Sequence, residues 1–228
     1  MGRLGICRLA HEGIPVRLAL EASSSNTPFF ARYLASDGSR GETERLLRSS
    51  IWGDVSGELY DGRGSLGLLR LLERIRALKA AGLDVDVYGV DRDSADPESV
   101  KSHRDFAMAF KISALAKAQP DALILGLMST GHAQKNMQAE TEIHPAWYSV
   151  GYFLRENMGT PYVTVFFEPE DGRARGAKLE YVGAKRNDYA LRTVPLTNSP
   201  PAKQTYDGTV LTQWLRASRM VNREGDVE

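Results

Sequence analysis

Two side chains able to take part in acid–base or metal chemistry follow apolar runs of the chain. Glu21 closes the run that begins at Val16, and His132 follows the run from residue 122 to 128 and a short Ser-Thr-Gly turn. A neutral imidazole can accept a proton from water or bind a metal ion, and a nearby carboxylate can fix its tautomer. Each residue also fits a plainer role, since Glu21 could cap a helix or pair with an arginine and His132 could be an ordinary loop histidine.

Further segments carry polar groups that could bind a ligand. Residues 52–54 and 60–65 form a glycine-rich approach to a helix. Such a turn can bind an anion through its N–H groups, with Arg63 as the counter-charge, or it can be only a capped turn. Asp91 ends another apolar run, and Arg104 lies within a predicted helix, where a solvated or salt-bridged face is the simpler interpretation.

The apolar runs predict the scaffold that must position these residues. Five runs rich in β-branched, leucine and aromatic residues are predicted as strands: Val16 to Ala22, Val85 to Asp91, Ala122 to Met128, Tyr162 to Glu168 and Lys178 to Val182. Two helical patterns separate the first three, one from Ser65 to Ala81 and one from Asp96 to Ala118. This alternation predicts an α/β fold with a mostly parallel central sheet flanked by helices.

The character of each strand predicts its place in the sheet. The third is almost continuously apolar, which predicts helices on both of its faces. The last two are joined by a glycine-containing turn and predict an antiparallel hairpin at the sheet edge. Because ligands gather beyond the carboxyl ends of the strands in such folds, we expect Glu21 and His132 to meet at that rim, with Asp91 beyond the neighbouring strand.

Length and composition limit the class of protein. The 228 residues are 42% hydrophobic and 25% charged, and they predict a single domain over residues 1–228 with a frayed tail at 220–228. Lysine plus arginine and aspartate plus glutamate both number 29, so no overall field attracts nucleic acid. Cys7 is the only cysteine, which excludes an intrachain disulfide.

Several recognisable signals are absent from the sequence. No apolar run approaches the roughly 18 residues of a membrane span, and Arg3 and Arg8 interrupt what would be the apolar part of a signal peptide. The chain as written is therefore predicted to be cytoplasmic, or periplasmic if a further N-terminal segment precedes it. G-x-S-x-G, P-loop, H-E-x-x-H and G-x-G-x-x-G motifs are also missing, which disfavours the usual hydrolases and nucleotide enzymes.

Taken in order, several segments resemble one superfamily. They are the strand ending in Leu18-Ala19-Leu20-Glu21, Trp52-Gly53, Asp61-Gly62-Arg63-x-Ser65, the strand to Asp91, Arg104-Asp105-x-x-Met108-Ala109 and the strand leading to His132-Ala133. From Gly13 to Phe167 the chain thus resembles the superfamily that groups erythromycin esterases, ChaN-like haem-uptake proteins and Tiki metalloproteases. The resemblance rests on order and context rather than on one diagnostic motif.

The resemblance implies a site built on Glu21 and His132. These residues would activate water, or they would hold a divalent metal ion such as Mn, Zn or Co, or haem. It also implies that Arg104 orients a carboxylate or polarises a substrate carbonyl. Four further residues would shape the substrate pocket: Asp61, Arg63, Asp91 and Trp52.

Two features depart from the superfamily pattern. Its members usually begin with a strand ending in a Gly-Glu-x-x-His-Gly-like motif, whereas this chain begins in what looks like the following helix, so half of the expected site is absent from it. The bend before the later histidine, often Gly-Asn-x-His-Ala, reads Ser129-Thr130-Gly131-His132-Ala133. The missing strand also predicts an uncovered sheet edge, through which the protein could form homo-oligomers.

Three functional hypotheses follow from these observations. The first is a hydrolase-like domain in which His132, helped by Glu21, activates water against an ester or amide in a small molecule or peptide, with or without a metal ion. The second is a ChaN-like haem- or iron-binding protein, with Tyr60, Trp147 or Tyr148 near the ligand. The third is a catalytically inactive, truncated member, for which both hydrolysis and haem titration would be blank.

Overall fold

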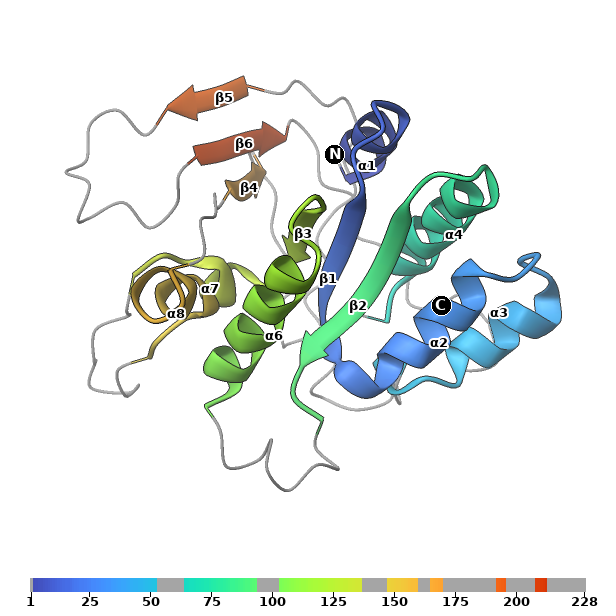
Figure 1. Cartoon of the computed structure of the whole chain (residues 1–228), viewed down its shortest axis with the longest axis horizontal. Coiled ribbons are helices and arrows are strands. Elements are labelled where there is room, and N and C mark those ends of the chain that lie inside the picture. Colours follow the sequence, from blue (N-terminus) through green and yellow to red (C-terminus); the bar gives the residue numbers. More distant parts are fainter. Residues whose placement is uncertain are drawn as a thin grey trace.

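The computed structural model describes residues 2–52, 64–93, 103–136, 147–159, 165–169, 192–195 and 208–212. Within these ranges the chain forms a central sheet with helices on both faces (Figure 1). Asp61, Arg63 and the predicted strand from Lys178 to Val182 lie outside the described residues.

Three parallel strands form the central sheet. They are β1 (Val16–Ser23), β2 (Val85–Asp91) and β3 (Leu123–Leu127), in the spatial order β2-β1-β3. Val16 of β1 lies opposite Val85 on one side and Leu123 on the other, so the three strands start at the same level. The predicted α/β class with a parallel sheet is therefore confirmed, and the first three strands match the predicted runs to within one residue at each end.

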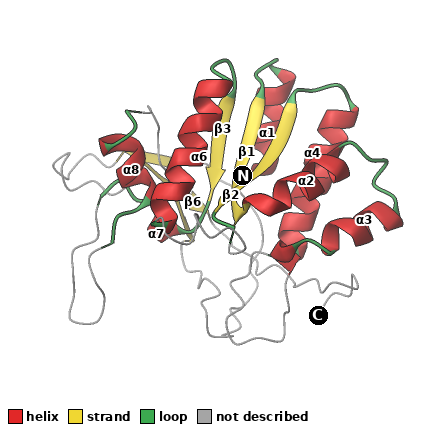
Figure 2. Ribbon diagram, turned by 60° about the horizontal axis from the view of Figure 1, so that its bottom comes forward, coloured by secondary structure: helices red, strands yellow, loops and turns green. Residues whose placement is uncertain are grey.

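Helices pack on each face of this sheet (Figure 2). One face carries α1 (Gly2–His11), α2 (Thr27–Leu34), α3 (Arg40–Leu47) and α4 (Leu66–Ala80), with the short 3-10 turns η1 (Ser24–Asn26) and η2 (Ser50–Trp52) between them. The other carries α6 (Arg104–Ala118) and α8 (Val150–Glu156), with the short α7 (Thr130–Ala133) beside α8. Alternate residues of β1 serve the two cores, since Leu18 packs with the first set of helices and Ala19 with the second.

Local sequence explains the limits of α4. Ser65 caps its first turn, where the side-chain oxygen accepts a hydrogen bond from the Leu68 N–H at 3.3 Å. Beyond the last turn, Gly82 takes a positive φ of 82°, a conformation that suits glycine. The predicted helix from Ser65 to Ala81 is thus confirmed, whereas the predicted start of the next helix at Asp96 lies outside the described residues.

The prediction that helices cover both faces of β3 is confirmed only in part, since Leu125 packs against the first core and Ile124 against the second. Leu123 and Leu127 are 40% and 47% exposed, although the strand is almost entirely apolar. Ile124 faces the α6 and α8 core, but among the described residues β3 pairs only with β1 and stands at the edge of the sheet. An apolar run therefore indicates a strand without showing how many neighbours cover it.

A second small sheet contains the other three strands, β4 (Val165–Pro169), β5 (Arg192–Pro195) and β6 (Gly208–Thr212). β4 pairs with β6 in parallel, and β5 pairs with β6 in antiparallel fashion. β4 overlaps the predicted fourth strand, but it is not hydrogen-bonded to the central sheet. The hairpin predicted with Lys178–Val182 stays a prediction, because its second strand lies outside the described residues.

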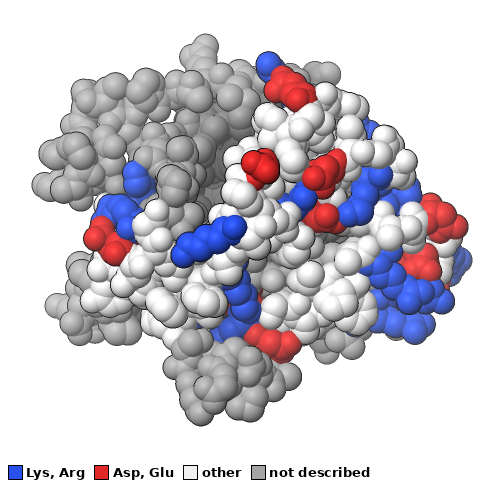
Figure 3. Space-filling view, in the orientation of Figure 1, with Lys and Arg blue, Asp and Glu red and all other residues white. Residues whose placement is uncertain are grey.

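On the face seen in Figure 3, the described residues include charged side chains of both signs, with lysines and arginines close to aspartates and glutamates. This mixture agrees with the equal numbers of acidic and basic residues in the whole sequence. Among the described helices, none combines the length and the apolar character needed to cross a membrane.

A β-bulge lies near the carboxyl end of β1. Leu20 pairs with Gly89 and Ser23 with Asp91, so a step of three residues on β1 faces a step of two on β2. Glu21 lies within this bulge. The Gly89 N–H donates to the Thr27 hydroxyl at 2.9 Å, and the backbone of Ala22 and Ser23 packs closely against its Cα.

Substitution of Gly89 by alanine should destabilise the protein. The added Cβ would lie 2.2 Å from the Ser23 carbonyl oxygen, which is backbone and cannot move away cheaply. We expect the free energy of unfolding to fall by about 2–3 kcal/mol in urea denaturation. Gly41→Ala is the matched control, because its Cβ meets nothing within 4 Å and the residue is helical, so stability should stay equal or rise slightly. Equal losses in both variants would contradict the role of Gly89.

Candidate functional site

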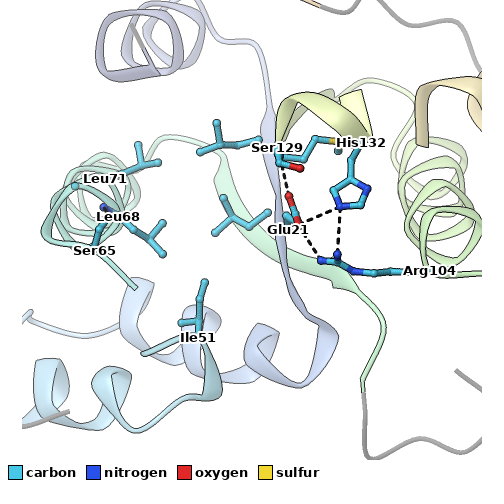
Figure 4. Close-up of a pocket in the computed structure, with 12 residues that line it drawn as sticks. Glu21, Ile51, Ser65, Leu68, Leu71, Arg104, Ser129 and His132 are labelled. Carbon is cyan, nitrogen blue, oxygen red and sulfur yellow. Dashed lines mark hydrogen bonds and ion pairs between the residues drawn. The ribbon is translucent and has the colours of Figure 1, made fainter. Parts of the chain in front are cut away.

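A cavity of about 580 Å³ lies at the carboxyl ends of β1 and β3 (Figure 4). Its two sides differ in character. Leucines of α4 and Ile51 of η2 lie on one side, and a polar group lies on the other. The apolar lining consists of Leu20, Ile51, Leu68, Leu71, Leu127 and Met128, and the polar lining includes Glu21, Ser65, Arg104, Ser129 and His132.

Glu21 joins two parts of the polar group. One oxygen, Oε1, accepts a hydrogen bond from Nη2 of Arg104 at 2.8 Å, and the other, Oε2, accepts from the backbone N–H of Ser129 at 2.7 Å. Only 10% of the side chain is exposed. The carboxylate thus ties the end of β1 to α6 and to the turn before α7, and both bonds favour its charged form.

Arg104, the first residue of α6, is held mainly by Asp91 at the end of β2. Its Nε lies 3.0 Å from both carboxylate oxygens of Asp91, and its Nη2 donates to one of them at 2.6 Å. Hydrogen bonding to Asp91 raises the pKa of Arg104 further above its ordinary value, although burial opposes this. The guanidinium is therefore a fixed positive charge that links the carboxylates of two neighbouring strands.

His132 is oriented by Asp105, the second residue of α6. Nδ1 of the imidazole lies 2.5 Å from Oδ1 of Asp105, and both side chains are almost completely buried. This contact requires the proton to be on Nδ1, because a carboxylate can only accept. The other ring nitrogen, Nε2, consequently lies on the side of Glu21 and Arg104, at 3.3 Å from Oε1 and 3.2 Å from Nη1.

The carboxylates around His132 favour its protonated form. Burial by itself lowers the pKa of His132, but the hydrogen bonds and charges of Asp105 and Glu21 outweigh burial and raise the pKa to about 9. Three carboxylates and one guanidinium meet here, and protonation of the imidazole brings the charges closer to balance.

The proton on Nε2 decides which neighbour this nitrogen can bind. A neutral imidazole presents a lone pair there, which can accept from Nη1 of Arg104. An imidazolium presents an N–H, which can donate to Glu21 instead. Both contacts lie within reach, so His132 can exchange a proton without a large movement.

The structure brings four of the predicted site residues together, namely Glu21, Asp91, Arg104 and His132. Asp91 contacts Arg104 and does not line the cavity. Trp52, which the resemblance assigned to the substrate pocket, is fully buried in the first core and does not line the cavity either.

Sequence reasoning missed three parts of the site. Asp105 was visible in the segment Arg104-Asp105-x-x-Met108-Ala109 but was given no role there. The Ser129 backbone N–H has no signature in sequence, because any residue type can supply it. The helix from Ser65 to Ala81 was predicted only as part of the scaffold, whereas its Leu68 and Leu71 also line the cavity. The one signal in the sequence was the position of Asp105 directly after Arg104, which could have indicated that it belongs to the same polar group.

The described residues do not fit a divalent metal ion at the predicted ligands. The two donor atoms, Glu21 Oε1 and His132 Nε2, lie 2.8 and 3.2 Å from nitrogens of Arg104, whose charge would repel a cation. In the described part of the chain no three His, Cys, Asp or Glu residues form a group that could hold a metal.

Haem binding also stays a prediction. Of the aromatic residues suggested for it, Tyr60 lies outside the described residues. Trp147 and Tyr148 do not line the cavity.

No protein-family model and no curated protein matches this chain. A solved structure does: a histidine-to-asparagine mutant of the erythromycin esterase EreC in its open conformation is similar with a TM-score of 0.52 and 13% identity, over 98% of this chain and 81% of that one. The chain shares this fold. The likeness agrees with the resemblance read from the sequence, but at this identity it carries no statement about activity. Nothing in the comparisons concerns the ChaN-like or Tiki proteins.

The stability of the protein should decrease with pH through the titration of His132. A pKa raised from 6.5 to about 9 means that the imidazolium stabilises the fold fully below about pH 6.5 and that this contribution is lost as the pH approaches 9. Between these limits the stability advantage of the wild type over His132→Gln should shrink by about 2–3 kcal/mol, measured by urea denaturation. Asp105→Asn removes one cause of the raised pKa of His132 and should therefore weaken the dependence of stability on pH. Parallel pH curves for wild type and His132→Gln would contradict it.

Replacement of Arg104 by lysine should destabilise the protein by about 2 kcal/mol. A single ammonium group cannot reproduce the contacts that the planar guanidinium makes with both oxygens of Asp91 and with Glu21. Arg155→Lys is the matched control, since the half-exposed pair of Arg155 with Glu156 should contribute less than about 0.5 kcal/mol. Urea denaturation measures both, and equal effects would count against a central role of Arg104.

Proposed function

We propose that this protein is a hydrolase that cleaves an ester or amide, with His132 as the residue that moves the proton. The main support for this proposal is the contact between Asp105 and Nδ1 of His132. It leaves Nε2 of this buried histidine directed toward the cavity-lining residues Glu21 and Arg104. A histidine oriented by a carboxylate in this way can take a proton at one nitrogen while the other stays bound.

The reaction divides among three side chains. Neutral His132 accepts a proton at Nε2 from a water molecule, whose oxygen then forms a bond to the substrate carbonyl carbon. Arg104 donates a hydrogen bond to the carbonyl oxygen as negative charge develops on it. The tetrahedral intermediate collapses, the bond to the leaving oxygen or nitrogen breaks, and His132 returns the proton to that atom. Glu21, 3.3 Å from Nε2, stabilises the imidazolium between these steps.

The lining of the cavity indicates the kind of substrate. Leu68 and Leu71 face the polar group across the cavity, so a molecule that fills it places an apolar part against α4 and a polar bond near Arg104. A small molecule or a peptide with an apolar group beside the ester or amide meets this condition. The exclusion of water by the leucines would strengthen the interactions of Arg104 and His132.

The likeness to an erythromycin esterase supports the class of reaction at the level of fold. That protein is named as an esterase, and its fold extends over nearly the whole of this chain. A shared fold does not transfer a substrate, so the assignment of a hydrolase here rests on the geometry of His132 and its partners.

Hydrolysis should increase with pH and should depend on His132. Because Nε2 must be neutral to accept a proton, kcat/KM for a neutral p-nitrophenyl ester should rise up to about pH 9, the pKa of His132. His132→Gln should lower kcat by at least about 100-fold at pH 9, and the difference from the wild type should shrink as the pH falls. Gly41→Ala, a substitution in an open position on α3, is the control and should keep the wild-type profile. Absence of hydrolysis with every ester and amide of a panel would refute the proposal.

A further inference from the structure

Trp147 makes a contact that the proposed reaction does not use. Its indole Nε1–H donates a hydrogen bond to Oδ2 of Asp105 at 2.9 Å. Its ring also meets the His132 imidazole edge to face, with ring centroids 5.0 Å apart and an angle of 88° between the planes. One side chain thus contacts both members of the pair that orients the reactive nitrogen.

The hydrogen bond restrains Asp105 in a way that His132 alone cannot. The carboxylate is only 3% exposed, and its other oxygen is bound to Nδ1 of His132. A buried carboxylate oxygen without a partner is costly, so the indole N–H favours the rotamer in which one oxygen faces each ring. Rotation of the carboxylate would break both bonds together.

The packing of Trp147 against α7 gives a second, independent observation. A Cβ built on Gly131 would lie 2.6 Å from Cη2 and Cζ3 of the indole. The ring therefore rests directly on the backbone of the residue before His132, at a distance that only glycine permits. The same indole therefore contacts Asp105, which accepts a hydrogen bond from His132, and the backbone of α7, which carries His132.

We propose that Trp147 is a positioning residue, which holds Asp105 and the α7 backbone so that Nε2 of His132 is directed at the substrate. This inference rests on the proposed role of His132. Trp147 does not line the cavity, so it acts through its two neighbours and not by contact with substrate. The expected consequence of its loss is a lower kcat with an unchanged KM.

Trp147→Phe tests the hydrogen bond, because phenylalanine keeps an aromatic ring but has no N–H donor, although it also fills less space than the indole. Tyr152→Phe on α8 is the matched control, since it deletes one polar group from an aromatic residue whose ring contacts Tyr148 and Phe153. We expect Trp147→Phe to lower kcat for the p-nitrophenyl ester by about 10- to 100-fold with KM within about twofold of the wild type, and Tyr152→Phe to leave both unchanged. Wild-type values in Trp147→Phe, or a change confined to KM, would overturn the inference.

Nuclear magnetic resonance of the imidazole gives a readout that needs no turnover. The proton on Nδ1 of His132, held against Asp105 at 2.5 Å, should appear far downfield in the wild type and in Tyr152→Phe. It should be broadened or lost in Trp147→Phe. If no ester is hydrolysed by any variant but this signal behaves as described, the proposed function fails and the positioning contact stands; an unchanged signal in Trp147→Phe overturns the contact whatever the activity.

A second variant and a measurement on the wild type cover the case in which Trp147→Phe does not fold. Gly131→Ala displaces the indole without altering its chemistry and should reproduce the loss of the downfield proton. In the unmodified protein, the Nε1 proton of Trp147 should exchange slowly with D₂O because it is bound to a buried carboxylate. Rapid exchange of this proton would overturn the inference without any substitution.

Discussion

The candidate site depends on the contacts that the guanidinium of Arg104 makes. The guanidinium binds Asp91 at the end of β2 and Glu21 at the end of β1, and it lies beside His132. Carboxylates at the ends of neighbouring parallel strands would repel each other if they were buried together without a cation. The arginine removes this repulsion and holds the three side chains within contact distance, which no apolar residue could do.

The same arrangement sets the protonation of His132. Asp105 holds one ring nitrogen, so the remaining chemistry of the imidazole takes place at the other, between a hydrogen-bond donor and an acceptor. The excess of negative charge favours the imidazolium, whereas burial favours the neutral ring. The effect of the charges is the larger one, so the pKa of His132 is raised. The balance leaves a group whose proton is held firmly near neutral pH and released more easily in alkaline solution.

The backbone contributes to the site as much as the charged groups do. A β-bulge carries Glu21 out of the regular ladder, and the absence of a side chain at Gly89 allows the bulge to pack closely. Gly131 plays a similar part on the other side, where the indole of Trp147 rests on α7. These close approaches explain why residues 89 and 131 are glycines.

The sequence by itself determined the α/β scaffold and the edge of the sheet at which Glu21 and His132 lie. Periodicity identified the three parallel strands and α4, because burial against two layers imposes a pattern on each element separately. It also placed Glu21 and His132 after strands whose carboxyl ends share one rim. Only the tertiary structure decided that Asp105 orients His132 and that Leu123 and Leu127 of β3 stay partly exposed. Contacts between residues far apart in sequence, and the number of layers over a strand, depend on distances that no local pattern records.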